Sequence, residues 1–345
     1  MSTCASAGLC SLVLVATLSA SEPIDVYPLW DGSESVASYA KRVNLPAAKS
    51  IHLGGGITLD LTLIPAGRFT MGTPVKISVM SAVILLCSGA SAILGLVAWL
   101  FLKKRPGGHF SYSLRWLILF SMACALLLGG CAQLYVALEG LKRYENADIA
   151  EQPAHTVTLT RPFYMGVFEV TQDQYQAVMG ANPSKFRGGK RPVESVTQDA
   201  IREFCENLKK IHGITAKLPT EAQWEFACRA GTMTAFNTGN TLDKTQANFG
   251  NSAAGTVPAG SYQSNSFGLF DMHGNVSEYC ILTDEEYSAT EKVDPAGSGR
   301  GEKLVQRGGT WSDNPKNCRS AQRIFCRGDY AGDGCGFRVI VLLTN

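Results

Sequence analysis

Two long hydrophobic runs limit the folds open to this chain more than any other feature of its sequence. No charged residue occurs from Ile77 to Leu102, and none occurs from Trp116 to Leu138. A helix needs about 20 predominantly apolar residues to cross a bilayer. Buried core helices are the alternative, but soluble helices of this length normally carry a charged face. The sequence therefore predicts two transmembrane helices, near residues 76–102 and 114–138.

The connector between the two runs carries only positive charge. It holds Lys103, Lys104, Arg105 and Arg115 and no acidic residue. Because cytoplasmic loops are enriched in Lys and Arg, this loop is predicted to face the cytoplasm and the chain on either side to face outward. We expect a membrane location, with the main domain on the extracytoplasmic side, periplasmic or at the cell surface. The expected partner is membrane lipid, contacted through the two helices.

The first residues have the pattern of a secretory signal. Leu9–Leu18 is apolar, and the small residues Ser19-Ala20-Ser21 follow it, as at a signal cleavage site. This pattern predicts a signal peptide over residues 1–21. Since no Lys or Arg precedes the apolar stretch, an uncleaved N-terminal anchor is the alternative.

Charge and cysteine content limit the expected partners and the expected cellular compartment. A net charge of +2 over 345 residues gives no reason to expect a nucleic acid partner. An oxidising compartment is compatible with disulfides, although six cysteines allow 15 pairings. Buried free thiols and a metal site are the alternatives, and zinc is not expected because no CxxC pair occurs. The six cysteines outside the predicted signal and membrane runs are Cys205, Cys228, Cys280, Cys318, Cys326 and Cys335.

Local patterns in the first part of the chain predict a short helix, a strand and a hairpin-like stretch. The N-terminal segment, 22–50, is polar, with one short helix expected at Ser35–Arg42. Apolar and polar residues alternate from Ile57 to Leu63, which predicts a half-buried strand. A hairpin-like stretch is expected to continue it over residues 64–74.

Past the second hydrophobic run, the sequence predicts strands at 155–159 and 163–171 and three helices. Thr171 is positioned to cap a helix over Gln172–Met179. A second helix is expected at Ala200–His212 and a third within 218–231, with Gly231 as its C-terminal stop. The inner face of the second helix is predicted to hold Ile201, Phe204, Cys205, Leu208 and Ile211. Cys205 and Cys228 could then lie close together.

Eight short motifs occur in an order that identifies a family resemblance. They are IPAGRFTMG (64–72), FEVTQDQY (168–175), PVESVTQDA (192–200), LPTEAQWEFACRAGT (218–232), FGLFDMHGNVSEY (267–279), RGGTW (307–311), CRSAQR (318–323) and GFRVI (336–340). Together they resemble the formylglycine-generating enzyme family, also called the sulfatase-modifying factor family, over residues 57–74 and 151–343.

The resemblance implies an α+β fold, related to C-type lectins, with little regular secondary structure. In this interpretation the domain begins at 51–74, is interrupted by the transmembrane hairpin at 75–141, and resumes at 151–345. An even number of spans returns the chain to the same side of the membrane, so the two parts of the domain can close on each other.

The resemblance also implies a catalytic centre that this chain only partly matches. The best-known members oxidise a cysteine of sulfatases with copper held by two cysteines, which follow the motif matched here by Gly308-Gly309-Thr310. Asp313 stands where the first cysteine is expected, and Cys318 has no partner at the family's spacing. Copper(I) prefers two soft thiolates, so copper is not expected. Thr310, Asp313 and Cys318 remain weak catalytic candidates, and the catalytic residues are otherwise unknown.

A second branch of the family binds iron through a histidine cluster, but the five histidines of this chain are scattered and form no HxxxH pair. Calcium fits the resemblance better, because hard cations prefer several oxygen ligands at close spacing. A solvated turn with local backbone hydrogen bonds is the alternative. The first calcium set comprises Asp271, Glu278 and the carbonyls of Gly274 and Val276, and the second comprises Asn248, Asn251 and the carbonyls of Phe249 and Ala253.

Two classes of function follow, and the sequence leaves the enzyme question open. The first is an extracytoplasmic family member without formylglycine-generating activity, because the cysteine pair is not matched. The alternative is a calcium-stabilised, lectin-like module that binds a peptide or glycan at the cell envelope. Glu221 and Glu225 could form a paired-carboxylate site, but capping by Glu221 and an ion pair of Glu225 are the preferred interpretation.

Overall fold

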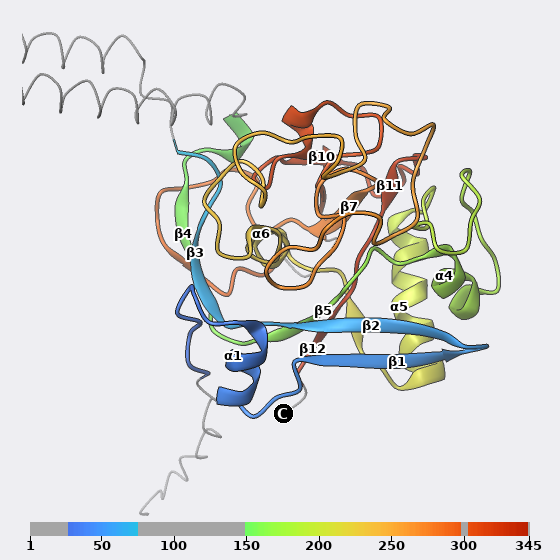
Figure 1. Cartoon of the computed structure of the whole chain (residues 1–345), viewed down its shortest axis with the longest axis horizontal. Helices are drawn as coiled ribbons and strands as arrows, with labels where there is room; N and C mark the ends of the chain where they lie inside the picture. Colours follow the sequence, from blue (N-terminus) through green and yellow to red (C-terminus); the bar gives the residue numbers. More distant parts are fainter. Residues whose placement is uncertain (1–26, 75–148, 298–302, 344–345) are drawn as a thin grey trace, which may run out of the picture.

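The computed structural model describes residues 27–74, 149–297 and 303–343. These residues form three β-sheets with helices packed around them, joined by long irregular segments (Figure 1). Both predicted membrane spans, near 76–102 and 114–138, and the predicted signal peptide lie outside the described residues.

No helix in the described part of the chain is both long enough and apolar enough to cross a membrane. The longest described helix is α5, Gln198–His212, with 15 residues, and its exposed face is charged. This finding contradicts the prediction that two helices bind membrane lipid, and membrane lipid is not retained as a partner. The transmembrane hairpin expected at 75–141 falls outside the described ranges and has no support from the structure.

The largest sheet has five antiparallel strands in the order β1-β2-β5-β12-β6. Its long hairpin pairs β1, Ala48–Gly54, with β2, Ile57–Ile64, and three consecutive glycines with positive φ make the turn. The other strands are β5 (Phe163–Gly166), β12 (Ile340–Leu342) and β6 (Ala216–Lys217). Leu59, Leu61 and Leu63 of β2 are buried, as the alternating pattern predicts.

Two smaller sheets complete the β-structure. One is ordered β10-β9-β7-β11, with β10 at Ile324–Cys326, β9 at Leu304–Arg307, β7 at Ser277–Ile281 and β11 at Cys335–Gly336. The other joins β3 (Gly67–Met71), β4 (His155–Leu159) and β8 (Lys292–Val293). The expected hairpin-like continuation of β2 is wrong, because β3 pairs with β4 and not with β2.

The helices form where local capping chemistry favours them. In α4, Gln172–Met179, the Thr171 hydroxyl accepts a hydrogen bond from the Gln174 backbone N–H, and the Gln174 side-chain oxygen accepts one from the Thr171 backbone N–H. Gly180 ends the helix with positive φ. Thr220 and Gln223 form the same capping box at α6, Glu221–Arg229. Such caps satisfy backbone N–H groups that have no partner within the helix. The remaining helices are α1 (Val36–Arg42), the 3₁₀ turn η1 (Ile149–Glu151) and the 3₁₀ turn η2 (Pro315–Cys318).

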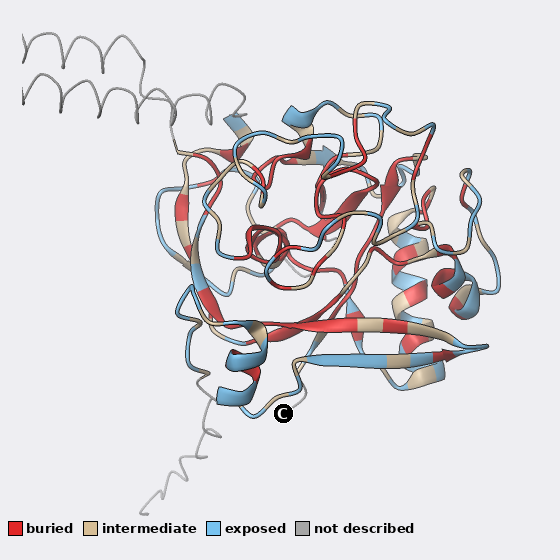
Figure 2. Cartoon of the chain, in the orientation of Figure 1, coloured by how far each residue is buried: buried red, intermediate tan, exposed pale blue. Residues whose placement is uncertain are grey.

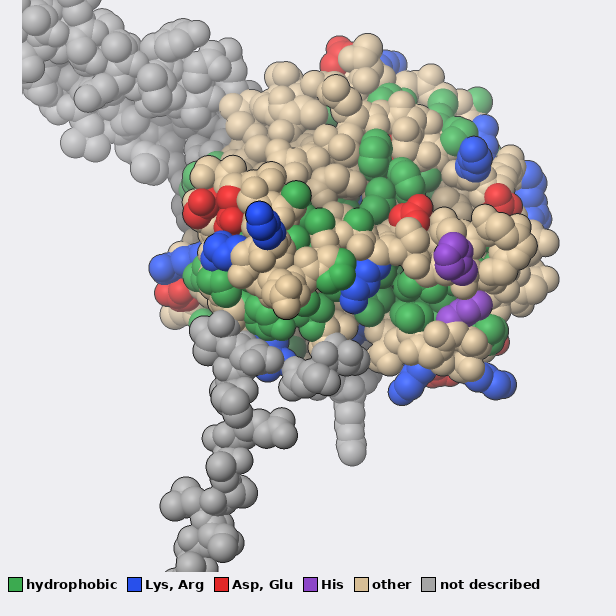
Figure 3. All heavy atoms as spheres, turned by 60° about the horizontal axis from the view of Figure 1, so that its bottom comes forward, with side chains coloured by type: hydrophobic (Ala, Val, Ile, Leu, Met, Phe, Trp, Pro, Cys, Tyr) green, Lys and Arg blue, Asp and Glu red, His purple; other side chains and the backbone are tan. Residues whose placement is uncertain are grey.

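The interior contains two large hydrophobic clusters. Figure 2 shows buried segments in the sheets and in α6. The first packs α5 against the five-stranded sheet, through Ile201, Phe204 and Leu208. Ile211, predicted on the same face, is 57% exposed, because it lies in the last turn of the helix before Gly213. On the face in Figure 3, hydrophobic side chains are interspersed with charged ones.

All six described cysteines are free thiols, so the structure contains none of the disulfides that the sequence allowed among them. Cys205 packs against the first cluster, whereas Cys228 belongs to the second. The expectation that these two cysteines lie close together is therefore not met. Helical spacing identifies an inward face, but it does not say which core that face enters.

Candidate functional site

The loop that follows β9 holds the three weak catalytic candidates. Gly308 and Gly309 have φ of +87° and +74°, which L side chains rarely adopt. A Cβ on Gly309 would lie 2.8 Å from the Cys318 sulfur. The two glycines therefore let the loop fold back tightly over Cys318.

Asp313 organises this loop through its carboxylate. One oxygen accepts bonds from the backbone N–H and the hydroxyl of Thr310, both at 2.9 Å. The other accepts a bond from the Asn317 side-chain amide at 2.9 Å. Asp313 and Thr310 thus hydrogen-bond to each other, as in a local turn. Among the described residues, no cysteine is hydrogen-bonded to either of them.

Cys318 is fully buried at the end of η2. Its thiol lies 3.6 Å from the Asn314 carbonyl oxygen. Burial, followed by the nearby Asp313 carboxylate, raises the pKa of Cys318 to about 12. Since the thiolate is the reactive and metal-binding form of cysteine, this side chain stays protonated and unreactive at neutral pH. The structure therefore brings Thr310, Asp313 and Cys318 together in one loop without a second thiol.

The first predicted calcium set does not fit as a whole. Both oxygens of Glu278 bond to the Arg338 guanidinium at 2.8–3.2 Å, and one also accepts a bond from Trp224 at 2.8 Å. Glu278 is 1% exposed. A carboxylate so fully paired has no oxygen left for a cation.

Asp271 differs from Glu278, because only one of its two carboxylate oxygens has a hydrogen-bond partner among the described residues. One of its oxygens accepts a bond from the Gly260 N–H at 2.6 Å. The other is buried and has no hydrogen-bond partner among the described residues. Burial raises the pKa of Asp271 to about 6. Within the first set, Asp271 is therefore the side chain with an oxygen available for a ligand.

Glu169 lies beside this loop and was not among the predicted site residues. Its carboxylate accepts bonds from the Asn275 amide at 2.8 Å and the Val276 N–H at 3.2 Å. Complete burial, and then the charges of Asp271 and Glu278, raise its pKa well above the usual value. A charged residue between Phe168 and Val170 is the sequence signal for such a buried polar group.

The second predicted calcium set is occupied by protein contacts. The Asn248 side-chain amide donates to the Gly255 carbonyl at 3.0 Å, and its oxygen accepts from Ser252 at 3.0 Å. The Phe249 carbonyl accepts a backbone bond from Ser252. Asn251 is exposed, as are parts of Ala253. In the described residues, no group of three or more His, Cys, Asp or Glu side chains is arranged to hold a metal ion.

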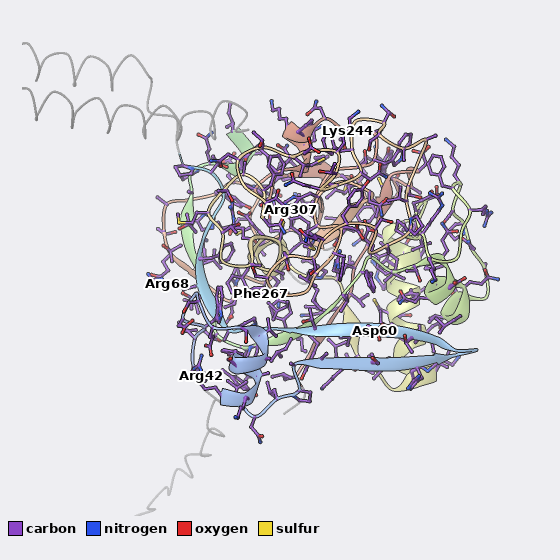
Figure 4. The ribbon with its side chains drawn as sticks, viewed as in Figure 1. Arg42, Asp60, Arg68, Lys244, Phe267 and Arg307 are labelled. Carbon is purple, nitrogen blue, oxygen red and sulfur yellow. The ribbon has the colours of Figure 1, made fainter. Side chains whose placement is uncertain are left out.

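Glu221 and Glu225 do not form a paired-carboxylate site. Glu225 is completely buried between Arg229 and Arg307, and Glu221 forms a buried ion pair with Arg323. The capping role proposed for Glu221 is wrong, because Gln223 closes the capping box at this helix. Figure 4 shows Arg307 inside the molecule, with Arg68 and Lys244 at its periphery.

A cavity of about 1190 Å³ lies away from the predicted site residues. It is bounded by η1, the loop after β7, the start of β9, and β10 with its following turn. We call it the β10 groove. Its lining includes Ile149, Leu282, Tyr287, Leu304 and Phe325. Sequence reasoning missed it because its residues come from five separate segments of the chain, one of which is the start of α5 at Gln198.

Comparisons with known proteins identify relatives of this fold. A sequence model of the sulfatase-modifying factor enzyme 1-like domain matches residues 126–343, more than half of the chain. The chain is 32% identical over 204 residues to the serine/threonine-protein kinase pkn1 of Chlamydia caviae, covering 50% of this chain and 32% of that protein. It is 29% identical over 166 residues to the formylglycine-generating enzyme of Bos taurus, covering 43% of each. The chain thus spans less than half the length of both relatives.

A solved structure shares the architecture. Treponema denticola variable protein 1 superposes with a TM-score of 0.60 at 22% identity, covering 86% of this chain and all of that one. At this identity the likeness concerns the fold alone. It confirms a sheet-rich, formylglycine-generating-enzyme-like fold with some helices.

Proposed function

Because the chain belongs to the sulfatase-modifying factor enzyme 1-like domain family, we propose that it is a member that binds a polypeptide without generating formylglycine. The observation that carries the proposal is the loop at 310–318. There Asp313 stands at the place of one expected cysteine, and the thiol of Cys318 is buried, which raises its pKa to about 12.

The chemistry of formylglycine generation, as the family resemblance implies it, needs two thiolates for copper(I). Asp313 offers a hard carboxylate, which copper(I) does not prefer, and its oxygens already bond to Thr310 and Asn317. Cys318 offers one sulfur in an apolar setting. Thr310, Asp313 and Cys318 therefore serve the shape of the loop in this proposal, and none acts on a substrate.

Binding is supported by the β10 groove, whose volume and mixed apolar and polar lining suit a ligand. The comparisons do not favour the alternative of a lectin-like glycan-binding module. A role outside the cytoplasm is part of the proposal, supported by Leu9–Leu18 and the small residues after it. Periplasmic or surface exposure can be tested by protease accessibility in intact cells.

Calcium enters as a separate proposal, supported by the unpartnered oxygen of Asp271. In this form Asp271 holds the ion, with the carbonyls of Gly274 and Val276 as further oxygens from the expected set. Glu278 is left out because Arg338 occupies it. The ion would stabilise the loop and take no part in a reaction.

The decisive experiment is an activity assay with copper. The purified chain is incubated with copper, oxygen and a cysteine-containing sulfatase peptide, with a formylglycine-generating enzyme as positive control. The peptide mass then reports conversion. We expect no formylglycine above the level of a heat-denatured sample, and product above that level would sink the proposal.

A further inference from the structure

The β10 groove borders a sheet edge that is open to another strand. In its four-stranded sheet, β10 pairs with β9 on one side, and no other described strand pairs with it. Its register places Phe325 opposite Val305. Edge strands present unpaired backbone N–H and C=O groups, which template the addition of an extended peptide.

The walls of the groove are held in place by Arg323, which precedes β10. Its guanidinium donates to the Ala150 carbonyl of η1 at 2.7 Å and to the carbonyls of Asp284 and Glu285 in the loop after β7. It also forms the buried ion pair with Glu221. These bonds join three segments around one fixed cation, so the groove is formed before a ligand arrives.

The chemistry of the lining identifies the ligand class. Leu282, Leu304 and Tyr287 are at most 7% exposed and form an apolar floor, whereas Phe325 is 51% exposed at the mouth. The Arg323 guanidinium lies over one part of the Phe325 ring, 5.0 Å from its centroid, and the exposed remainder of the ring is apolar surface that a ligand can cover. An apolar side chain of a ligand would cover Phe325 and the floor.

The rim favours a positive ligand. Lys303 is paired with Glu285, and Arg327 with Asp329. The remaining rim carboxylate, Glu286, is exposed and has no ion pair recorded among the described residues. The charged lining therefore holds three carboxylates against two cations, and a basic side chain complements it.

We propose that an extended polypeptide with alternating apolar and basic residues adds as a strand to the free edge of β10, with an apolar side chain on Phe325 and a basic one near Glu286. This inference rests on the proposed function. It deepens that function by naming the ligand class and the surface that binds it.

The test uses the full chain and a fluorescein-labelled peptide of eight residues alternating valine and lysine, titrated by fluorescence anisotropy. A matched peptide carries glutamate in place of lysine, and a second carries N-methyl groups on alternate backbone amides. We expect binding of the valine–lysine peptide, with at least tenfold weaker binding of each matched peptide. Equal binding of the N-methylated peptide would overturn strand addition.

Variants locate the site. Phe325→Ala should weaken binding at least about tenfold, as removal of an aromatic anchor does, and Glu286→Gln about twofold to fivefold, as for an exposed charge pair. Met233→Ala is the matched control, since Met233 is 60% exposed and lies outside the β10 groove. Its affinity should equal that of the wild type.

The outcomes separate this inference from the proposed function. Binding that survives Phe325→Ala unchanged, or no binding of the valine–lysine peptide, overturns the β10 groove as the site. Formylglycine in the copper assay overturns the proposed function, whatever the peptide titrations show. Circular dichroism of each variant confirms that a loss of binding is not a loss of fold.

Discussion

Replacement of Glu225 by glutamine should strongly destabilise the fold. Glu225 is completely buried on α6 and accepts bonds from Arg229, from Arg307 and from the Gly72 backbone N–H. The amide of glutamine keeps the size of the side chain and removes its charge. Arg307, which is also completely buried, then loses its only carboxylate partner recorded in the described part of the chain.

The size of the loss in stability depends on the hydrogen-bond partners that Arg307 keeps. Removing one partner of a buried ion pair costs about 3–5 kcal/mol, because the other charge stays buried and uncompensated. Arg307 still donates to the carbonyls of Ser320, Ala321 and Gln322, which solvate part of its charge. We therefore expect a loss of about 3 kcal/mol, a large share of the 5–15 kcal/mol that typically holds a domain together.

Equilibrium urea unfolding measures this loss, and Glu291→Gln is the control. Glu291 pairs with Arg68, but both side chains are about half exposed, at 47% and 58%, and such pairs contribute only about 0–1 kcal/mol. If Glu225→Gln costs no more than Glu291→Gln, burial does not strengthen the dependence of Arg307 on its partner, and the reasoning fails.

The same variant has a predicted pH signature. Burial opposes ionisation of Glu225, but the guanidinium groups of Arg229 and Arg307 outweigh it and lower its pKa. The stabilisation from Glu225 is therefore fully present above the unfolded pKa of about 4.3 and is lost as pH falls through the lower folded value. Wild type should lose stability over this acidic window, and Glu225→Gln should lose less.

Three further predictions concern the loops. Native Cys318 should resist alkylation by iodoacetamide at pH 8, because burial raises its pKa to about 12. After denaturation it should react, and peptide mass measures both results. Rapid labelling of the native protein would contradict the proposal that this thiol is unreactive. Gly309→Ala should lower the free energy of unfolding in urea by more than about 1 kcal/mol, because φ is +74° and the new Cβ would meet the Cys318 sulfur. Gly55 also has positive φ but lies in open space, so Gly55→Ala should lower it less. Equal losses of stability would rule out the close approach at Gly309. Asp271→Asn should raise the melting temperature in chelator near pH 7. Burial raises the folded pKa of Asp271 to about 6, so the stabilisation present below the unfolded pKa of about 3.9 is lost as pH rises through the folded pKa. Calcium should raise the melting temperature of wild type only, and no calcium effect on either protein would count against the ion.

Some local features were predicted correctly from the sequence. The cap at Thr171 and the alternation in β2 depend on residues within a few positions of one another. The C-terminal stop expected at Gly231 falls one residue earlier, where Ala230 adopts the left-handed conformation. The family resemblance supplied the sheet-rich fold, because motifs in fixed order carry information about contacts that no single window contains. The membrane-lipid prediction failed because hydropathy alone was used to infer a partner.

Partners across the chain could be assigned only from the tertiary structure. Asp271 and Glu278 lie seven positions apart and look alike in sequence, yet Arg338, sixty residues beyond Glu278, neutralises one and leaves the other with a bare oxygen. Cys205 and Cys228 both face inward on helices, but into different cores.

The sequence by itself therefore determined the cap of α4 at Thr171, the strand that begins at Ile57, the family and the lack of a matched cysteine pair. Each depends on residue identity at short or motif-defined spacing. The tertiary structure decided which carboxylates are paired, that Cys318 is buried, and that five separate segments enclose the β10 groove. The reason is physical: burial and charge pairing depend on what surrounds a side chain in space, and for these groups the surroundings come from distant parts of the chain.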